Sequence, residues 1–170
     1  MELSQRELWT VIHGMILGAT FLLAFAGGLA GLYSLRPDLL TATGIRERLP
    51  RLEIGTAVMA VTAWLTVVSG TWIVYVWYRD PSPASPRNLL LANPSRAEWH
   101  HFGMEWKEHV AWLAPIVATA VAFVVFYYGP RLARETAMRN VLIALFTFAF
   151  GAAAIAGLFG AFINKMAPIV

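Results

Sequence analysis

LWTVIHGMILGATFLLAFAGGLAGLY, residues 8–33, is the stretch of this chain that decides its fold. It holds no Asp, Glu, Lys or Arg, and about 20 apolar residues in a helix cross a hydrocarbon core about 30 Å thick. Backbone amides in lipid must be satisfied internally, and the period-two alternation of a barrel strand is absent, so we expect a helix. Three further apolar stretches have the same character: 54–78, 110–128 and 141–163. The sequence therefore predicts an all-α integral membrane four-helix bundle, a single transmembrane domain over residues 1–170.

The composition supports a membrane protein independently of these stretches. The chain is 58% hydrophobic and 14% charged, whereas soluble domains are about 25% charged. Trp and Tyr gather near the ends of the apolar stretches, as an interfacial aromatic belt requires. The net charge of +3 comes from basic residues between the helices, so no nucleic-acid partner is expected. The absence of cysteine excludes disulfides, thiolate-bound iron–sulfur clusters and covalently attached haem.

The distribution of basic residues gives an expected orientation. The first apolar stretch is far longer than a signal-peptide core, so we expect it to be retained as a helix. Four crossings place both termini on one side, which carries six Lys and Arg residues against seven on the other. The compact clusters at 46–51 and 131–139 lie on the second side, which the positive-inside rule makes cytoplasmic. We expect a multi-pass protein of the bacterial inner membrane with its termini on the outer face.

The connections between the crossings differ in character. We expect the segment 34–51 to be a loop closed by Pro37, Gly44 and Pro50, with a short interfacial helix within it. The segment 79–94 contains four prolines and is predicted to be extended. The third connection, around Gly129-Pro130, is short, so the last two helices are predicted to be antiparallel neighbours.

Small residues recur at four-residue spacing in the first and last crossings. Gly14 and Gly18 form one such pair, and Ala153 and Gly157 form another. This spacing lets helix backbones approach closely in lipid. It indicates helix-packing faces or, alternatively, room for a flat cofactor.

The segment 96–109 is the most polar part of the chain that still has a helical pattern. One stripe along it is apolar: Trp99, Phe102, Trp106 and Leu113. An adjacent stripe is largely polar: His101, Glu105, Glu108 and Trp112. We predict an amphipathic interfacial helix that leads into the third crossing.

Histidines at matching depth are the candidate cofactor ligands. His13 lies inside an otherwise apolar helix, where an ionisable side chain is costly and marks a functional site or an internal hydrogen bond. His109 lies at the start of the third crossing, on the same side of the membrane. His101 is an alternative ligand if the amphipathic segment folds back over the bundle. Because neutral imidazole is a common axial ligand of haem iron, His13 and His109 are a candidate bis-histidine pair for haem b.

This topology and histidine placement resemble small four-helix membrane-bound b-type cytochromes and the cytochrome b subunits that anchor respiratory enzymes. The resemblance implies one haem b near one membrane face, exchanging electrons with quinol or a partner cytochrome in a respiratory or photosynthetic complex. Glu105 and Glu108 are the candidate proton acceptors if quinol is oxidised there. Helices two and four contain no histidine, so a second bis-histidine haem is not expected.

Two alternatives to haem remain open from the residues. Glu98 and His101 have the Glu-x-x-His spacing of carboxylate-bridged di-iron bundles. A copper site would draw on other residues of the same segment: His100, His101, Met104 and His109. A cofactor-free accessory subunit that holds a larger membrane complex together would explain the aromatic and Gly/Ala-rich faces, but not His13. Transport is not expected, since no acidic residue lies deep in a crossing.

Overall fold

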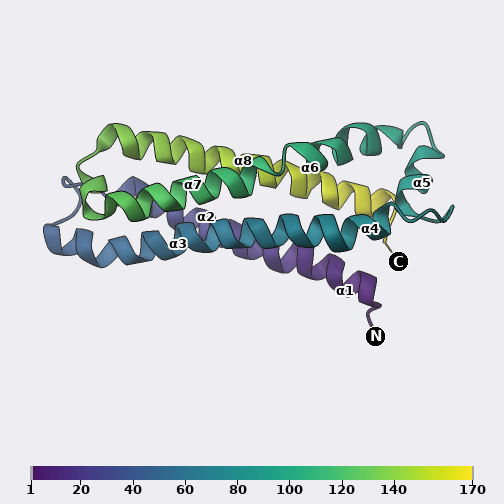
Figure 1. Cartoon of the computed structure of the whole chain (residues 1–170), viewed down its shortest axis with the longest axis horizontal. Helices are drawn as coiled ribbons and strands as arrows, with labels where there is room; N and C mark the ends of the chain where they lie inside the picture. The colour runs from purple at the N-terminus through teal and green to yellow at the C-terminus, as the bar shows by residue number, and fades with distance from the viewer. Residues whose placement is uncertain (1, 170) are drawn as a thin grey trace. The chain divides into compact units, whose positions relative to one another are not determined.

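The structure is a computed structural model that describes residues 2–169, and all regular secondary structure in that range is helical. Four helical spans are long and apolar enough to cross a membrane (Figure 1). Their bounds are Gln5–Ser34, Ala42–Tyr78, Trp99–Ala133 and Thr136–Met166. The predicted all-α membrane class with four crossings is therefore confirmed.

The first two spans are each interrupted by a π-helical turn. The first span consists of α1 (Gln5–Val11), the π-helical turn η1 (Ile12–Ile16) and α2 (Leu17–Ser34). The second consists of α3 (Ala42–Ser69), the π-helical turn η2 (Gly70–Val74) and α4 (Tyr75–Tyr78).

The second half of the chain has shorter elements before its last long helix. They are α5 (Pro86–Leu91), the π-helical turn η3 (Trp99–Met104), α6 (Glu105–His109), α7 (Leu113–Tyr128), the 3₁₀ turn η4 (Gly129–Ala133) and α8 (Thr136–Met166). Figure 1 shows α5 in the connection between α4 and α6. Gly129, with φ of 52°, opens the short turn between α7 and α8, a backbone conformation that favours glycine.

Helix α1 begins before the apolar stretch because a capping box fixes its start. Ser4 Oγ accepts a hydrogen bond from the Glu7 backbone N–H at 3.2 Å, and the Ser4 N–H donates to Glu7 Oε2 at 2.8 Å. Two otherwise orphaned donors of the first turn are thus satisfied.

Two predictions about the proline-containing segments are wrong. The loop predicted through residue 51 is helical from Ala42, and Pro50 lies inside α3. Pro50 is exposed and lies in the third turn of α3, where it removes one backbone hydrogen bond without ending the helix. The segment 79–94, predicted to be extended, contains α5, where Ser85 Oγ caps the Asn88 N–H and Pro86 takes the first helical position.

Internal contacts divide the chain into two compact units. Unit 1 comprises residues 1–19, 64–112 and 152–170, and unit 2 comprises residues 20–63 and 113–151. Each unit contains a part of all four spans, because α2, α3 and α8 contribute residues to both.

The core of unit 2 is built from phenylalanine rings and close helix contacts. Phe25 and Phe150 stack with ring centroids 3.9 Å apart. Phe146 is fully buried, and its Cζ lies 2.7 Å from where a Cβ would stand at Gly28. Small residues permit such approaches in lipid, where apolar burial does not drive helix association.

The core of unit 1 joins the amphipathic segment to the end of α8. Its buried members come from four parts of the chain: Tyr78, Leu90, Met104, Ile163 and Ala167. The Phe102 and Trp106 rings both pack on Phe159, with centroids 5.6 and 6.2 Å away, and Trp99 packs on Phe162. The apolar stripe predicted for residues 96–109 therefore faces α8.

Adjacent glycines in α2 provide a matched test of the unit 2 core. We expect Gly28→Leu to destabilise the protein by about 1–3 kcal/mol, because the buried Phe146 ring has no room to move away. Gly27→Leu is the control, since no described residue lies within 4 Å of a Cβ built there. The melting temperature of the detergent-purified protein measures both effects, and equal melting temperatures would contradict this packing.

Candidate functional site

The three π-helical turns of the described chain all lie in unit 1. A π-helical turn shifts the register of the side chains and is frequent at functional sites. His13 lies in η1, Gly70 begins η2, and His100 and His101 lie in η3. Unit 1 is therefore where we place the candidate functional site.

His13 is held inside unit 1 by Ser69, the last residue of α3. Its Nδ1 lies 2.9 Å from Ser69 Oγ, and that hydroxyl donates its own hydrogen to the Thr66 carbonyl oxygen at 3.1 Å. When the Ser69 hydrogen points to the Thr66 carbonyl, Ser69 accepts from His13, and the imidazole proton then lies on Nδ1 with a lone pair on Nε2. This tautomer is the one a metal-binding Nε2 requires.

The face of the His13 ring is in contact with η2. A Cβ at Gly70 would stand 2.8 Å from His13 Cε1 and 3.4 Å from Nε2, so only glycine leaves room for the ring. Lys107 acts electrostatically on His13 from α6, and its Nζ lies 2.6 Å from a Cβ built at Gly160. His13 thus lies among a hydroxyl, a glycine backbone and a cation.

A second polar contact joins α4 to η3. The Tyr78 hydroxyl and His100 Nδ1 lie 2.9 Å apart, and both residues are buried. The aromatic end of the second span therefore meets the histidine-bearing segment. Of the two adjacent histidines in η3, His100 is buried and His101 is exposed.

The two candidate proton acceptors have different partners. Glu108 pairs with Arg79, whose Nη2 lies 3.2 and 3.3 Å from the two carboxylate oxygens. The Arg79 guanidinium also lies over the Tyr75 ring, 4.9 Å from its centroid. Glu105 is about half exposed, and its Oε2 lies 3.4 Å from His109 Nδ1. Glu108 is thus part of the polar interior of unit 1, and Glu105 lies at its surface.

His109 is a surface residue. Its side chain is 70% exposed, and its Nδ1 donates to the Glu105 carbonyl oxygen at 3.0 Å. Within residues 2–169, no hydrogen bond or ring contact joins His13 to His101 or His109. Two histidines that bind one haem iron need not touch each other, so His13 and His109 stay a predicted pair.

No larger metal-ligand set is assembled in the part of the chain that the structure describes. There, no three of its His, Asp and Glu residues come together in positions that could hold a metal ion. Glu98 and His101 accordingly gain no further carboxylate or imidazole partner of the kind a di-iron centre needs.

The two glycines proposed to make room for a cofactor have open space beside them. Around a Cβ built at Gly14 or Gly18, no described atom lies within 4 Å. These two glycines of the first span therefore have unfilled space beside them.

Several residues of the site were not identified from the sequence. Ser69, Gly70 and Lys107 carry no motif that marks them as partners of His13. The inward face of the third span runs through His100, Met104 and Lys107, one residue earlier than the predicted polar stripe. Gly103 lies on this face, with Phe159 and Ile163 of α8 3.6 Å from its Cβ position.

The bond between Tyr78 and His100 can be tested by removing one oxygen atom. We expect Tyr78→Phe to lower the free energy of unfolding by about 1–3 kcal/mol, because it leaves a buried imidazole nitrogen without a partner. Tyr127→Phe is the control, since that tyrosine is exposed and its hydroxyl bonds to no described residue. Thermal unfolding in detergent measures both, and an unchanged Tyr78→Phe midpoint would refute the contact.

Comparison with known protein families, with curated proteins and with solved structures finds no match to this chain.

Proposed function

We propose that this chain is a membrane-embedded subunit of a larger complex, and that it binds its partners through helix faces lined by small residues. The observation that carries the proposal is the contrast between two kinds of glycine. Four stand where an added Cβ would come within 3.1 Å of a side chain of the same unit: Gly28, Gly31, Gly70 and Gly160. Three have ordinary contacts at 3.4 Å or more: Gly44, Gly55 and Gly103. The others have no described neighbour within 4 Å of a Cβ: Gly14, Gly18, Gly27, Gly129, Gly151 and Gly157.

The open glycines within the spans need a physical reason. A glycine inside a helix costs about 0.5–1 kcal/mol relative to alanine. At Gly28 that cost is offset by the contact with Phe146, but at Gly14 and Gly18 no contact within the chain offsets it. Small residues at four-residue spacing are the surface on which another membrane helix packs closely.

The burial of the spans supports the same proposal. Only 28–33% of the most apolar window of each span is buried within the chain. Much of each helix surface is therefore free to contact lipid or a partner helix.

Bulky substitutions at Gly14 and Gly18 test the proposal directly. We expect Gly14→Leu and Gly18→Leu to leave the melting temperature of the isolated chain unchanged, because the added side chains meet nothing within it. In the native membrane they should lower the amount of chain that migrates in its complex at least severalfold. Native electrophoresis of mildly solubilised membranes measures that amount.

The matched control for this pair is Ile16→Phe. Ile16 is exposed and lies about half a helical turn from Gly14. Ile16→Phe enlarges an already bulky side chain on another face of the same helix, so the complex should persist. Complexes that resist Gly14→Leu and Gly18→Leu, or that are lost equally with Ile16→Phe, would overturn the proposal.

Electron transfer through haem b is the second candidate, and the state of His13 favours it. A partly buried imidazole whose Nδ1 is held by Ser69, so that Nε2 can bind a metal, has the form of a haem-iron ligand. His109, whose Nδ1 is likewise held, is the proposed second ligand. When bound, the haem would supply one-electron chemistry.

The remaining assignments belong to this second candidate. Quinol or a partner cytochrome is the proposed electron donor, with Glu105 or Glu108 taking the quinol proton. Placement in a bacterial inner membrane with the termini outside rests on the distribution of Lys and Arg.

A visible spectrum decides whether haem is bound. If His13 is a ligand, the dithionite-reduced protein shows a band near about 560 nm, and His13→Ala loses it. Ser69→Ala is the companion variant, since it keeps the His13 imidazole and removes only the hydrogen bond between Ser69 and His13 Nδ1. A featureless spectrum of protein purified in haem-sufficient cells, or a band that survives His13→Ala, would reject this candidate.

A further inference from the structure

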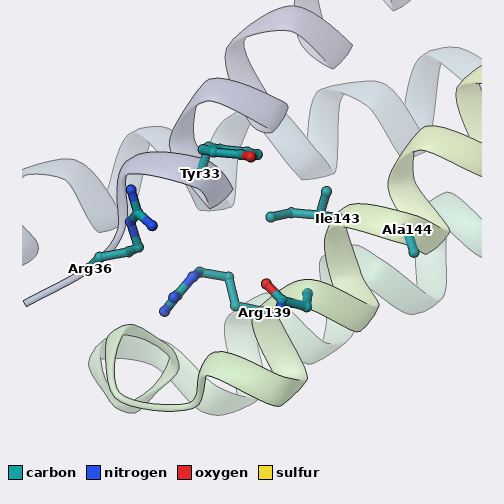
Figure 2. Close-up of a pocket in the computed structure, with 6 residues that line it drawn as sticks. Tyr33, Arg36, Arg139, Ile143 and Ala144 are labelled. Carbon is teal, nitrogen blue, oxygen red and sulfur yellow. The ribbon is translucent and has the colours of Figure 1, made fainter.

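A pocket of about 270 Å³ lies in unit 2, between the end of the first span and the start of the fourth. Its lining residues are Tyr33, Arg36, Arg139, Asn140, Ile143 and Ala144. Figure 2 shows Tyr33, Arg36, Arg139 and Ile143 arranged around the opening. Pockets for drug-sized ligands measure about 300–1,000 Å³, so this one suits a small polar group.

Arg139 is a buried cation without an acidic partner. The residue is 4% exposed, and its Nη1 donates to the carbonyl oxygens of Leu35 at 3.3 Å and Ala133 at 3.0 Å. No ion pair joins it to a carboxylate within residues 2–169. A buried charge is costly unless an opposite charge compensates it, and the two carbonyl groups are neutral.

Arg36 brings a second cation to the same pocket. Its Nε is buried and has no hydrogen-bond partner among the described residues. The nearest carboxylate oxygen, on Asp38, is 3.9 Å away and exposed, which is too far for a hydrogen bond. The Tyr33 ring lies 5.9 Å from the guanidinium carbon. One donor of Arg36 therefore remains unused beside the buried charge of Arg139.

The lining of the pocket changes from polar to apolar along the helices, in the same order as a membrane changes from headgroups to acyl chains. Tyr33 and Arg36 lie at the end of the first span, and Arg139 and Asn140 lie in the first turns of α8. Ile143 and Ala144 lie about one turn deeper in α8, where lipid tails begin. A phospholipid has this same order, an anionic phosphate followed by apolar chains.

Unit 2 also carries the net positive charge of the chain. Its sequence contains seven arginines and four carboxylates, whereas unit 1 contains six basic and six acidic residues. A basic surface at a membrane interface attracts anionic lipids, with each nearby cation contributing about 1 kcal/mol.

We propose that the pocket lined by Arg36 and Arg139 binds the phosphate of one anionic glycerophospholipid, with the lipid's acyl chains running past Ile143. The phosphate would accept hydrogen bonds from the two guanidinium groups and neutralise the charge of Arg139. The Tyr33 hydroxyl and the Asn140 amide line the same pocket and are additional donors. This inference is independent of the proposed function, because the pocket lies wholly within unit 2.

The test compares two arginine variants in the full-length, detergent-purified protein. Arg36→Gln removes a pocket cation that holds no structural hydrogen bond, so the fold should persist. Arg134→Gln removes an exposed arginine from the same unit that does not line the pocket. Phosphatidylglycerol, phosphatidylcholine with identical chains, and inorganic phosphate are each titrated, and bound lipid is counted by native mass spectrometry.

We expect the wild-type protein to bind one phosphatidylglycerol about tenfold or more tightly than phosphatidylcholine. Loss of a charge-assisted hydrogen bond should weaken that binding about tenfold in Arg36→Gln, while Arg134→Gln binds as the wild type does. Equal binding of the two lipids, or equal weakening by the two variants, would overturn the proposal in favour of a diffuse basic surface. If inorganic phosphate displaced the lipid at similar concentrations, the site would be one for free phosphate and the lipid assignment would be wrong.

Discussion

Close approach of helices at glycine is the constraint on which the rest of this structure depends. Lipid provides no hydrophobic drive for helix association, so van der Waals contact and hydrogen bonds must hold the spans together. Phe146 reaches the backbone at Gly28, and the His13 ring reaches the backbone at Gly70. A methyl group at either position would meet a ring that has no free space. The same principle applies to Gly14 and Gly18. They would permit another helix to approach closely, but no described helix of this chain does so.

The polar interior of unit 1 depends on the second of these contacts. Because Gly70 leaves room for the His13 ring, its Nδ1 can donate to Ser69 and its Nε2 keeps a lone pair. A neutral imidazole in an apolar helix bundle is suited to binding a metal or accepting a proton, and it is also the least costly form to keep in lipid.

The sequence predicted the helical class and the four crossings because apolar length is a strong, local signal. It also predicted that Trp99, Phe102 and Trp106 share one face, which the contacts with Phe159 and Phe162 confirm. Pro50 and Pro86 were misread as helix breakers. Pro86 follows the Ser85 cap at the first position of α5, where proline costs little. Pro50 lies inside α3, and the helix continues through it. His13, which contacts Ser69, and His100, which contacts Tyr78, both lie in π-helical turns. No residue pattern in the sequence predicts a π-helical turn.

We infer that this chain works as one part of a membrane assembly. The mass of the wild-type particle, extracted from its native membrane together with the surrounding lipid and without detergent, tests this inference. We expect a particle whose protein mass clearly exceeds the 18.8 kDa of one chain, with partner subunits in fixed ratio to it. A particle containing a single copy of this chain and no other protein would contradict the inference.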